Sequence, residues 1–377
     1  MANVGEKIAS FFRKQVHWLL PLAFIVLLQV GMQFPEWVEN EYSVGFYPFI
    51  SRFQRFITGW LPFSVGDLIY LALILFSFGQ ILLIFRLWVQ QKLTGLILKQ
   101  KLGKAIRGLL WVYIVFYALW GMNYYRKGIV QQLQITRQEY CKEEVEVLTH
   151  QLIDSLNACR RQLKDTVLPA PSLPDIFQKA EQAYRQASKQ WPFLHYTAHS
   201  IKGSMWSFLG DYIGFTGYYN PFSGEAQVRT DIPRVLTAFI ACHEIGHQLG
   251  YASETEANIA GYLAAASGDV YFRYSLYNDL FSYAQSEEIK QALIIDKDTA
   301  ALGAMFRYNK SHLDSLVRKD RKEIRAFFRK RDNTMAPAMS MLYDQYLKLN
   351  QQAEGIESYN EVIGWLLAYR KNMANYK

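Results

Sequence analysis

Three stretches in the first third of the chain contain no charged side chain. They cover residues 18–34, 68–85 and 108–125, and each is 17 or 18 residues long, close to the lower limit for a helix that crosses a bilayer. Aromatic residues such as Trp120 lie near their ends, where rings favour the boundary between lipid and water. The pattern predicts a membrane domain, residues 1–125, with three transmembrane helices.

Beyond residue 125, apolar positions recur at helical spacing among many charged ones, which predicts a mostly helical domain over residues 126–377. Residues 200–232 differ, because glycines alternate with aromatic residues and show little helical period, as strands and turns do. We therefore expect a mainly α membrane protein, with three N-terminal transmembrane helices followed by a mostly helical α+β domain that has a small sheet. The helices expected in this domain are 127–166, 175–190, 269–284, 311–330, 336–352 and 357–372.

Charge supports this division and predicts an orientation. The chain has 41 basic and 33 acidic side chains, a net of +8, and the first 125 residues alone carry 11 basic and 5 acidic ones, a net of +6. A nucleic-acid-binding protein would concentrate this excess on its folded domain, so we expect the partner to be a lipid bilayer and not nucleic acid. The loop between the second and third stretches has six basic and no acidic residues. The positive-inside rule then places the N-terminus in the cytoplasm and residues 126–377 outside it.

The three cysteines, Cys141, Cys159 and Cys242, form no CxxC pair and predict no thiolate zinc site. Cys141 and Cys159 could pair in an oxidising compartment, and three free thiols are an equally good reading. Cys242 is best explained as a small buried apolar residue.

The sequence ACHEIGHQLG begins at residue 241 and places His243 and His247 four residues apart. Pro233 suits the first turn of a helix, so both histidines are expected on one helical face, where they can share one metal ion. Glu244 lies beside them and can take a proton from a metal-activated water. The motif predicts His243 and His247 as Zn²⁺ ligands and Glu244 as the catalytic base.

A third ligand is expected soon after this helix ends at Gly250. Ser253 is a good N-cap for the next helix, and Ser253-x-x-Glu256 fits a capping box, which would occupy Glu256. Glu254 then lies in the first turn, with Asn258 four residues later on the same side, where its amide can orient a ligand histidine. We favour Glu254 as the third ligand and keep Glu256 as the alternative.

The stretch HEIGHQLGYASETEAN resembles the zincin superfamily, in particular gluzincin metallopeptidases, in which HExxH is followed by a helix with E-x-x-A-(D/N). The segments WGMNYYR, GYYNPFSGEA, CHEIGHQLG, ETEAN, YDQYLK and EGIESYN are similar to an uncharacterised bacterial membrane family, domain-of-unknown-function family 3810, over nearly the whole chain. The resemblance implies a zincin-like fold for residues 126–377 and a place in the bacterial cytoplasmic membrane. It also implies ligands His243, His247 and a glutamate of ETEAN, with Glu244 as base. Asn258 replaces the aspartate common in related gluzincins.

Residues 217–228 could supply a strand against which an extended peptide substrate lies. Tyr219, Asn220 and Glu225 are the residues in it that we expect to contact substrate. Glu225 could instead be a calcium ligand, and a solvated turn carboxylate explains it as well as these two roles together. Hydrolysis also needs a donor to the developing oxyanion. The candidate donors are Tyr218, Tyr219 and Tyr359.

Two functions are compatible with this pattern. The first is a membrane-anchored zinc peptidase that hydrolyses peptide or protein substrates. The alternative is a catalytically inactive zincin-like binding or sensor module at the cell envelope, which the short spacing between His247 and Glu254 leaves open. A transporter is disfavoured, because the three apolar stretches contain no ionisable residue that would mark an ion path.

Overall fold

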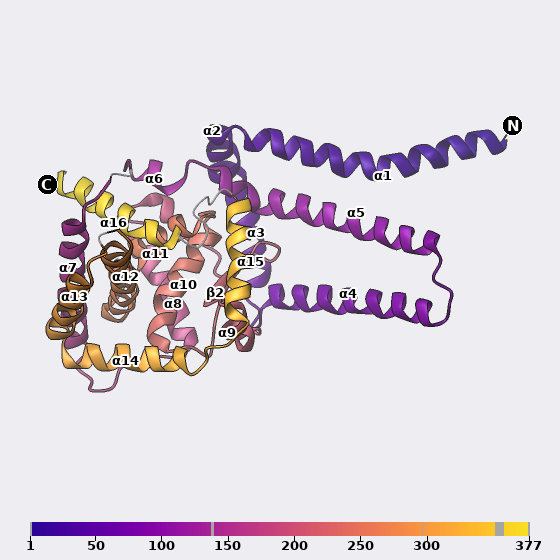
Figure 1. Cartoon of the computed structure of the whole chain (residues 1–377). Helices are drawn as coiled ribbons and strands as arrows, with labels where there is room; N and C mark the ends of the chain where they lie inside the picture. The colour runs from indigo at the N-terminus through magenta and orange to yellow at the C-terminus, as the bar shows by residue number, and fades with distance from the viewer. Residues whose placement is uncertain (1, 137–138, 296, 351–357, 376–377) are drawn as a thin grey trace.

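The computed structural model describes residues 2–136, 139–295, 297–350 and 358–375 (Figure 1). Three long helices project from one side of a helical globular part, which comprises residues 35–64 and everything described after residue 119. These three helices are α1 (Ala2–Met32), α4 (Val65–Val89) and α5 (Gly95–Leu119).

Two of these helices, α4 and α5, are each long and apolar enough to cross a membrane. A third candidate is α1 together with the segment after it, since Val16–Met32 and Pro35–Thr58 satisfy the same criteria as a pair but meet at an angle of 93°. The chain therefore carries two helices of this kind, or three if the bent pair counts as one, which indicates association with a membrane.

The third predicted stretch, residues 108–125, overlaps the end of a longer helix and extends six residues past it. The helix begins at Gly95 and ends at Leu119, and residues Gly121–Tyr125 form a 3-10 turn, η2. Trp120 is only 5% exposed, and its indole N–H bonds to the globular part. Its ring therefore packs inside the protein and does not mark the boundary between lipid and water.

The segment between the first two long helices is itself helical. It comprises α2 (Pro35–Trp37), the π-helix η1 (Val38–Phe46) and α3 (Tyr47–Thr58). Val38, Tyr42 and Tyr47 join Met32, Tyr117, Trp120 and Tyr219 in an apolar cluster between the long helices and the globular part. The division of the chain after residue 125 into two domains stays a prediction, but this segment packs on the rest of the globular part.

The centre of the globular part is α10 (Arg234–Gln248), which contacts α8 (Leu173–Ala187), α11 (Glu254–Ala266), α12 (Val270–Lys290) and the sheet. α7 (Lys142–Gln162) packs on the far side of α12. Small and apolar residues such as Ala241, Ile245 and Leu263 form the core between them. The remaining elements are η3 (Pro192–Leu194), η4 (Ser207–Leu209), α9 (Gly210–Ile213), α6 (Gly128–Gln132), η5 (Gln291–Ile295), α13 (Thr299–His312), α14 (Ser315–Arg329), α15 (Ala336–Leu349) and α16 (Ser358–Asn375).

The small sheet predicted between residues 200 and 232 is confirmed. Its strands are β1 (Ile201–Gly203), β2 (Gly217–Asn220) and β3 (Glu225–Val228), in the order β1-β3-β2. β1 runs parallel to β3 and β2 antiparallel to it, with Tyr219 opposite Ala226. β2 is thus an edge strand of the described sheet, and it contacts α10.

A bridge between Cys141 and Cys159 is ruled out by their places on α7. Cys141 caps the first turn and Cys159 lies near the last, so the rise of 1.5 Å per residue separates their Cα atoms by about 27 Å. A disulfide needs less than about 7 Å. Both cysteines are free thiols.

Candidate metal centre

The centre is built on two consecutive helices joined by a tight turn. Gly250 follows the end of α10 with φ +86°, a left-handed conformation that glycine adopts without steric cost. The Ser253 hydroxyl then accepts the Glu256 N–H, which starts α11 as a predicted N-cap. α11 packs closely on α10, because Gly261 lies so near His243 that a Cβ there would be 3.0 Å from the His243 backbone nitrogen.

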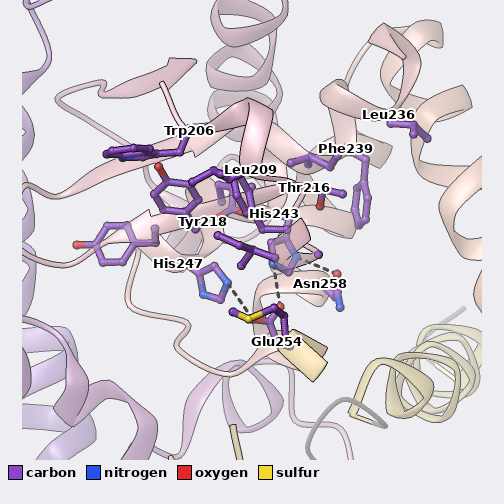
Figure 2. A pocket seen from close by; sticks show the side chains of 18 of the residues that line it. Trp206, Leu209, Thr216, Tyr218, Leu236, Phe239, His243, His247, Glu254 and Asn258 are labelled. Carbon is purple, nitrogen blue, oxygen red and sulfur yellow. Dashed lines mark hydrogen bonds and ion pairs between the residues drawn. The ribbon is translucent and has the colours of Figure 1, made fainter. Parts of the chain in front are cut away.

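Three of the predicted site residues come together on these helices (Figure 2). His243 Nε2 lies 3.2 Å from Glu254 Oε2, and His247 Nε2 lies 3.8 Å from Glu254 Oε1. The three potential ligand atoms all lie within 4.8 Å of one another. Tetrahedral zinc bonds of 2.0–2.1 Å place ligand atoms about 3.3 Å apart, so small side-chain adjustments would suffice for this donor set to hold the ion.

Hydrogen bonds fix how the two imidazoles are turned. His243 Nδ1 lies 2.9 Å from the Asn258 side-chain oxygen, and His247 Nδ1 lies 2.8 Å from the Tyr251 carbonyl. Because both partners are acceptors, each Nδ1 carries a hydrogen, and the neutral imidazole keeps its lone pair on Nε2. Asn258 thus occupies the orienting position that was predicted for it, and this arrangement is the one that a metal-binding histidine needs.

The two histidines differ in their affinity for a proton. Burial lowers the pKa of His247 to about 4. Burial acts in the same direction on His243, but the hydrogen bond and charge of Glu254 outweigh it and raise the pKa of His243 to about 9. A metal ligand must be the neutral imidazole, so a metal at this centre replaces the proton shared between His243 and Glu254.

Glu244 lies beside this cluster in a nearly enclosed position. Its side chain faces Gly217 at the start of β2, where an added Cβ would be 2.4 Å from Glu244 Oε1. Burial, with the Glu254 charge adding to it, raises the pKa of Glu244 to about 8. Its Oε2 has no hydrogen-bond partner among the described residues. An unpartnered buried carboxylate oxygen at a cavity wall is suited to bind a proton from water or substrate.

Glu256, the alternative third ligand, has another place. Its Oε1 accepts the Ile129 N–H at 3.0 Å, and its Oε2 lies 3.2 Å from the Ser253 hydroxyl. Burial raises its pKa, while nearby Arg126 opposes the shift. Glu256 therefore caps α11 and joins it to α6, and the geometry places Glu254 with the histidines.

A cavity of about 1190 Å³ opens beside the cluster. His243, His247 and Glu254 point into one side of it, while Trp206, Leu209 and Tyr218 lie across from them (Figure 2). Most of the other walls are apolar and come from distant parts of the chain. They include Tyr70, Leu73 and Ile74 of α4, Phe116 of α5, Trp120 and Tyr124 near η2, Ile324 and Phe328 of α14, and Met339 and Leu342 of α15.

Two polar wall residues escaped the sequence analysis. Asp279 and Tyr283 lie one turn apart on α12, line the cavity and share a hydrogen bond. Burial raises the pKa of Asp279 to about 6, although nearby His243 opposes the shift. Their i, i+4 spacing is common on any helix, so the sequence carried no signal that singled them out.

Of the three residues predicted to contact substrate, the structure brings only Tyr219 to the cavity. Asn220 instead accepts the N–H groups of Phe222 and Ser223, which closes the turn after β2. The buried Glu225 carboxylate accepts the N–H groups of Val65 and Gly66 and so caps α4. A carboxylate at a helix N-terminus complements the partial positive charge there, which explains a buried acid in this turn.

The candidate oxyanion donors also separate. Tyr218 lines the cavity, but its hydroxyl is engaged by Asp67 and Ser204. The Tyr219 hydroxyl lies 3.4 Å from that of Tyr47. The side chain of Tyr359 lies outside the described residues.

The C-terminal end of α10 is held by residues from the membrane-proximal segments. The Gln248 carbonyl accepts hydrogen bonds from the side chains of Tyr47, Ser51 and Arg55 at 2.8–3.0 Å. The His247 carbonyl accepts the Trp120 indole N–H at 3.0 Å. The last carbonyls of a helix lack partners within the helix, so α3 and Trp120 complete the helix that carries both histidines. We call this set of contacts the α10 clamp.

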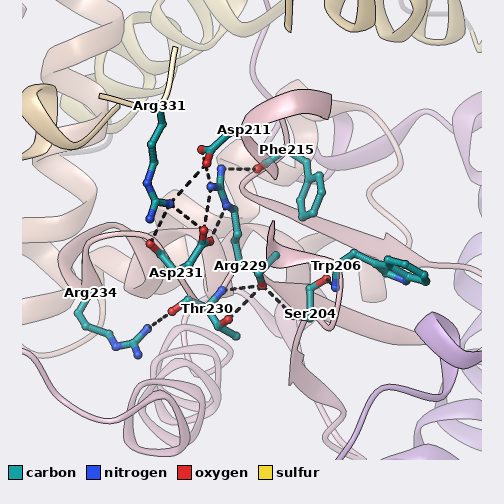
Figure 3. A network of polar contacts seen from close by, with 10 residues as sticks. Ser204, Trp206, Asp211, Phe215, Arg229, Thr230, Asp231, Arg234 and Arg331 are labelled. Carbon is teal, nitrogen blue, oxygen red and sulfur yellow. Dashed lines mark hydrogen bonds and ion pairs between the residues drawn. The ribbon is translucent and has the colours of Figure 1, made fainter. Parts of the chain in front are cut away.

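A second polar network joins segments that lie next to the cavity wall (Figure 3). The buried Arg229 guanidinium contacts Asp211 at 2.5 Å and Asp231 at 2.7 Å. Arg331, just before α15, bonds to Asp231 at 2.7 Å. Asn333 donates to the Asp211 carbonyl. The network thus ties the start of α15 to α9 and to the loop that leads into α10.

These features define a mostly helical protein with long apolar helices and a cluster of two histidines on α10 and a glutamate at the start of α11. The chain belongs to a family of proteins of unknown function, DUF3810, whose model matches residues 42–367. The match includes α3 and the two long helices α4 and α5, so the α10 clamp lies within the family's common region. No curated protein and no solved structure matches the chain. The family membership predicted from the sequence is confirmed, and the resemblance to zincins stays a prediction.

Proposed function

We propose that this protein is a membrane-anchored, zincin-like zinc peptidase. The observation that carries the proposal is the cluster of His243, His247 and Glu254, whose potential ligand atoms lie within 4.8 Å of one another. Two histidines and one glutamate, with a fourth position left for water or substrate, are the ligand set of many hydrolytic zinc sites. The adjoining cavity of about 1190 Å³ has room for several residues of a peptide.

The residues around the cluster have distinct roles in this proposal. Zinc, when bound, supplies a Lewis acid that lowers the pKa of water to about 7 and polarises a carbonyl. Glu244 accepts the proton that water loses as it attacks the peptide carbonyl, and then gives it to the leaving amine. Asn258 and the Tyr251 carbonyl hold the two imidazoles in position. The burial of Glu244 excludes bulk water that would compete for the proton.

The edge strand β2 is the proposed backbone partner of the substrate. Gly217, Tyr218 and Tyr219 of this strand line the cavity, and an extended peptide commonly binds beside an edge strand. Because Gly217 has no side chain, its backbone lies directly against the Glu244 carboxylate, so a peptide bond held beside this end of β2 would be near the proposed base. Asp279 and Tyr283 on the facing helix are placed to contact the substrate from the other side.

The proposal places the globular part outside the cytoplasm of a bacterial cell. The three long helices leave the globular part from the same side, so their far ends lie together (Figure 1). Basic residues concentrate toward these far ends on α4, α5 and the loop between them, which agrees with the positive-inside rule. They are Arg86, Lys92, Lys99, Lys101 and Lys104.

The test uses the full-length protein purified in detergent, because the α10 clamp draws on residues before 126. Zinc is measured by mass spectrometry in the wild type and in the matched variants Glu254→Gln and Glu256→Gln. We expect about one zinc per chain in the wild type and in Glu256→Gln, and its loss in Glu254→Gln. Cleavage of a library of internally quenched peptides is then measured for the zinc-loaded wild type and for Glu244→Gln.

Each result has a defined meaning. Cleavage by the wild type and not by Glu244→Gln, at equal zinc content, supports the peptidase. Zinc loss in Glu256→Gln but not in Glu254→Gln would show that Glu256, and not Glu254, is the third ligand. Zinc binding with no cleavage of any peptide, or of native envelope proteins, would favour the alternative of an inactive binding or sensor module.

A further inference from the structure

We propose that the cavity receives its substrate from within the bilayer, and that this substrate is a polypeptide with a long apolar chain next to the bond to be cut. The apolar chain is an acyl anchor or a hydrophobic segment of the polypeptide. The inference rests on the proposed peptidase function, because it names the substrate class of the same site. Four observations on the walls and the rim of the cavity carry it.

The first observation is that one wall of the cavity is part of a candidate membrane span. Leu73 and Ile74 of α4 line the cavity, yet they are 47% and 56% exposed. The uncharged run of this helix begins at Leu68, so the helical rise places Ile74 about 9 Å along it. In a hydrocarbon layer of about 30 Å, the cavity wall then extends below the surface of the bilayer.

The second observation is the separation of α4 from the other long helices. α1 and α5 pack against each other, whereas the apolar window of α4 has no buried residue and the helix stands apart (Figure 1). Phe116 of α5 also lines the cavity, so both helices contribute to its wall. Lys101 of α5 bonds to Gln80 of α4 at 2.8 Å, away from the bases of the two helices. In this proposal the substrate enters between those bases.

The third observation is that α15 crosses this path at the base of the long helices. Its first turn lies beside α9, near the start of α4, and Asn350 at its other end accepts the Tyr117 hydroxyl of α5 at 3.1 Å. Met339 and Leu342 on this helix line the cavity. Leu342 is 63% exposed, so α15 presents an apolar surface both to the path and to the cavity.

The fourth observation is that the segments next to the start of α4 carry exposed apolar side chains. Phe49, Phe53 and Phe56 lie at helical spacing on α3, and each is at least 65% exposed. Met205 and Phe208 are exposed too, and the Met205 N–H bonds to Asp67 in the first turn of α4. Exposed apolar surface of this kind is typical of contact with the apolar part of a membrane.

The distribution of polar groups in the cavity indicates what enters it. The hydrogen-bonding and charged side chains gather around the metal cluster and β2, while the walls toward α4, α5 and α15 are almost entirely apolar. A polar peptide would lose hydrogen bonds to water along those walls without replacement. An acyl chain or a run of apolar side chains loses none, and it positions the adjoining peptide bond beside His243 and Glu244.

The test measures photo-crosslinking in full-length Glu244→Gln protein, so that bound peptide is not cut, reconstituted in phosphatidylethanolamine/phosphatidylglycerol vesicles. Benzoylphenylalanine replaces Phe328 in the cavity wall or, as the matched control, the exposed Phe306 on α13, which does not line the cavity. Three probe peptides share one sequence and differ in their anchor: none, an N-terminal palmitoyl chain, or a twenty-residue Leu/Ala segment. Zinc-loaded wild-type protein in the same vesicles is assayed in parallel for cleavage of each.

We expect at least one anchored probe to crosslink at Phe328 about tenfold more than the unanchored probe, because anchoring raises the local concentration at the opening. The increase at Phe306 should be smaller, and the probe that reacts identifies whether the apolar chain is an acyl group or a polypeptide segment. Equal crosslinking of all probes at Phe328, or the same increase at Phe306, overturns the inference. Selective crosslinking of an anchored probe without cleavage refutes the peptidase and supports the membrane route. Faster cleavage of the unanchored probe than of the anchored ones supports the peptidase and refutes the membrane route.

Discussion

The two halves of the cavity are built on opposite principles. One half carries the candidate metal ligands His243, His247 and Glu254, and we call it the metal half. It lies within sixteen residues, from His243 to Asn258, on two helices joined by one tight turn. Its side chains are buried, and each imidazole is held by a hydrogen bond. The apolar half is assembled from α4, α5, α14 and α15, far apart in the sequence, and several of its side chains are largely exposed.

This difference teaches where precision is needed. Metal binding and proton transfer depend on atoms placed to within a fraction of an ångström, so the residues responsible sit on rigid, consecutive helices. An apolar wall needs only the right shape and chemistry, and many side chains satisfy it. The two halves should therefore respond very differently to substitution, with steep losses in the metal half and shallow ones in the wall.

The largest effect is expected from His247→Ala. It removes one of three ligands, so zinc content should fall from about one per chain to nearly none, as measured by mass spectrometry. His312→Ala is the control, because that exposed histidine lies on α13 outside the cluster. Equal zinc content in His247→Ala and the wild type would show that His247 is not a zinc ligand, and the contrast between the two halves would then have no basis.

A large effect on catalysis alone is expected from Glu244→Gln. The amide keeps the size of the side chain but cannot accept the proton, so the peptide cleavage rate should fall by about 10²–10⁴ while zinc content is unchanged. The matched change Glu256→Gln, at a glutamate that caps α11, should leave the cleavage rate near that of the wild type. A Glu244→Gln protein that cleaved at the wild-type rate would contradict its role as base.

An intermediate effect is expected from Asn258→Ala. His243 loses the acceptor that orients its ring, and loss of such a partner typically lowers metal affinity about 10–100-fold. Competition with a chelator of known affinity measures the change. Asn258→Asp restores an acceptor at the same place and should recover most of the affinity, so a failure to recover would show that the Ala variant acts through packing instead.

A smaller effect, on stability, is expected from Ser51→Ala in the α10 clamp. One of three hydrogen bonds to the Gln248 carbonyl is lost, which should cost about 1 kcal/mol of unfolding free energy. This corresponds to a fall of about 1 °C in the melting temperature of a protein of 377 residues, read by thermal unfolding in detergent. Arg52→Ala, at the neighbouring exposed position of α3, is the control and should leave the melting temperature nearly unchanged.

The smallest effect on stability is expected from Leu342→Ser in the apolar half. The side chain is 63% exposed, so the unfolding free energy should change by no more than about 0.5 kcal/mol, and zinc content should be unchanged. Leu347→Ser on the same helix is the contrast, because Leu347 is 1% exposed and its loss should be clearly destabilising. If both variants destabilised equally, α15 would belong to the core and the contrast between the two halves would weaken.

The same contrast explains what the sequence could predict. His243, His247, Glu254 and Asn258 interact through helical spacing and one short turn, so local pattern was enough to bring them together. Glu256 was recognised as a capping residue for the same reason. The mostly helical fold and the small sheet followed from periodicity and from the glycines between residues 200 and 232.

Contacts between distant segments left no such local trace. Glu225 resembles a turn carboxylate in the sequence, and only the tertiary fold shows that it caps α4. Trp120 looked like the aromatic end of a membrane span, yet it bonds to the last turn of α10. The proximity of Gly217 to Glu244 likewise depends on how a strand and a helix pack, which no spacing rule specifies.

The α10 clamp has a consequence for the order in which the protein is made. Its donors, from Tyr47 to Trp120, all precede α10 in the chain, so they have left the ribosome before the histidines are synthesised. The last carbonyls of α10 can then form their hydrogen bonds with side chains that are already in place. Helix α11 follows directly and brings Glu254 to the two histidines as soon as it leaves the ribosome. A copy of residues 126–377 released without the preceding segments would lack those side chains, so those segments serve as a template for the assembly of the candidate metal centre.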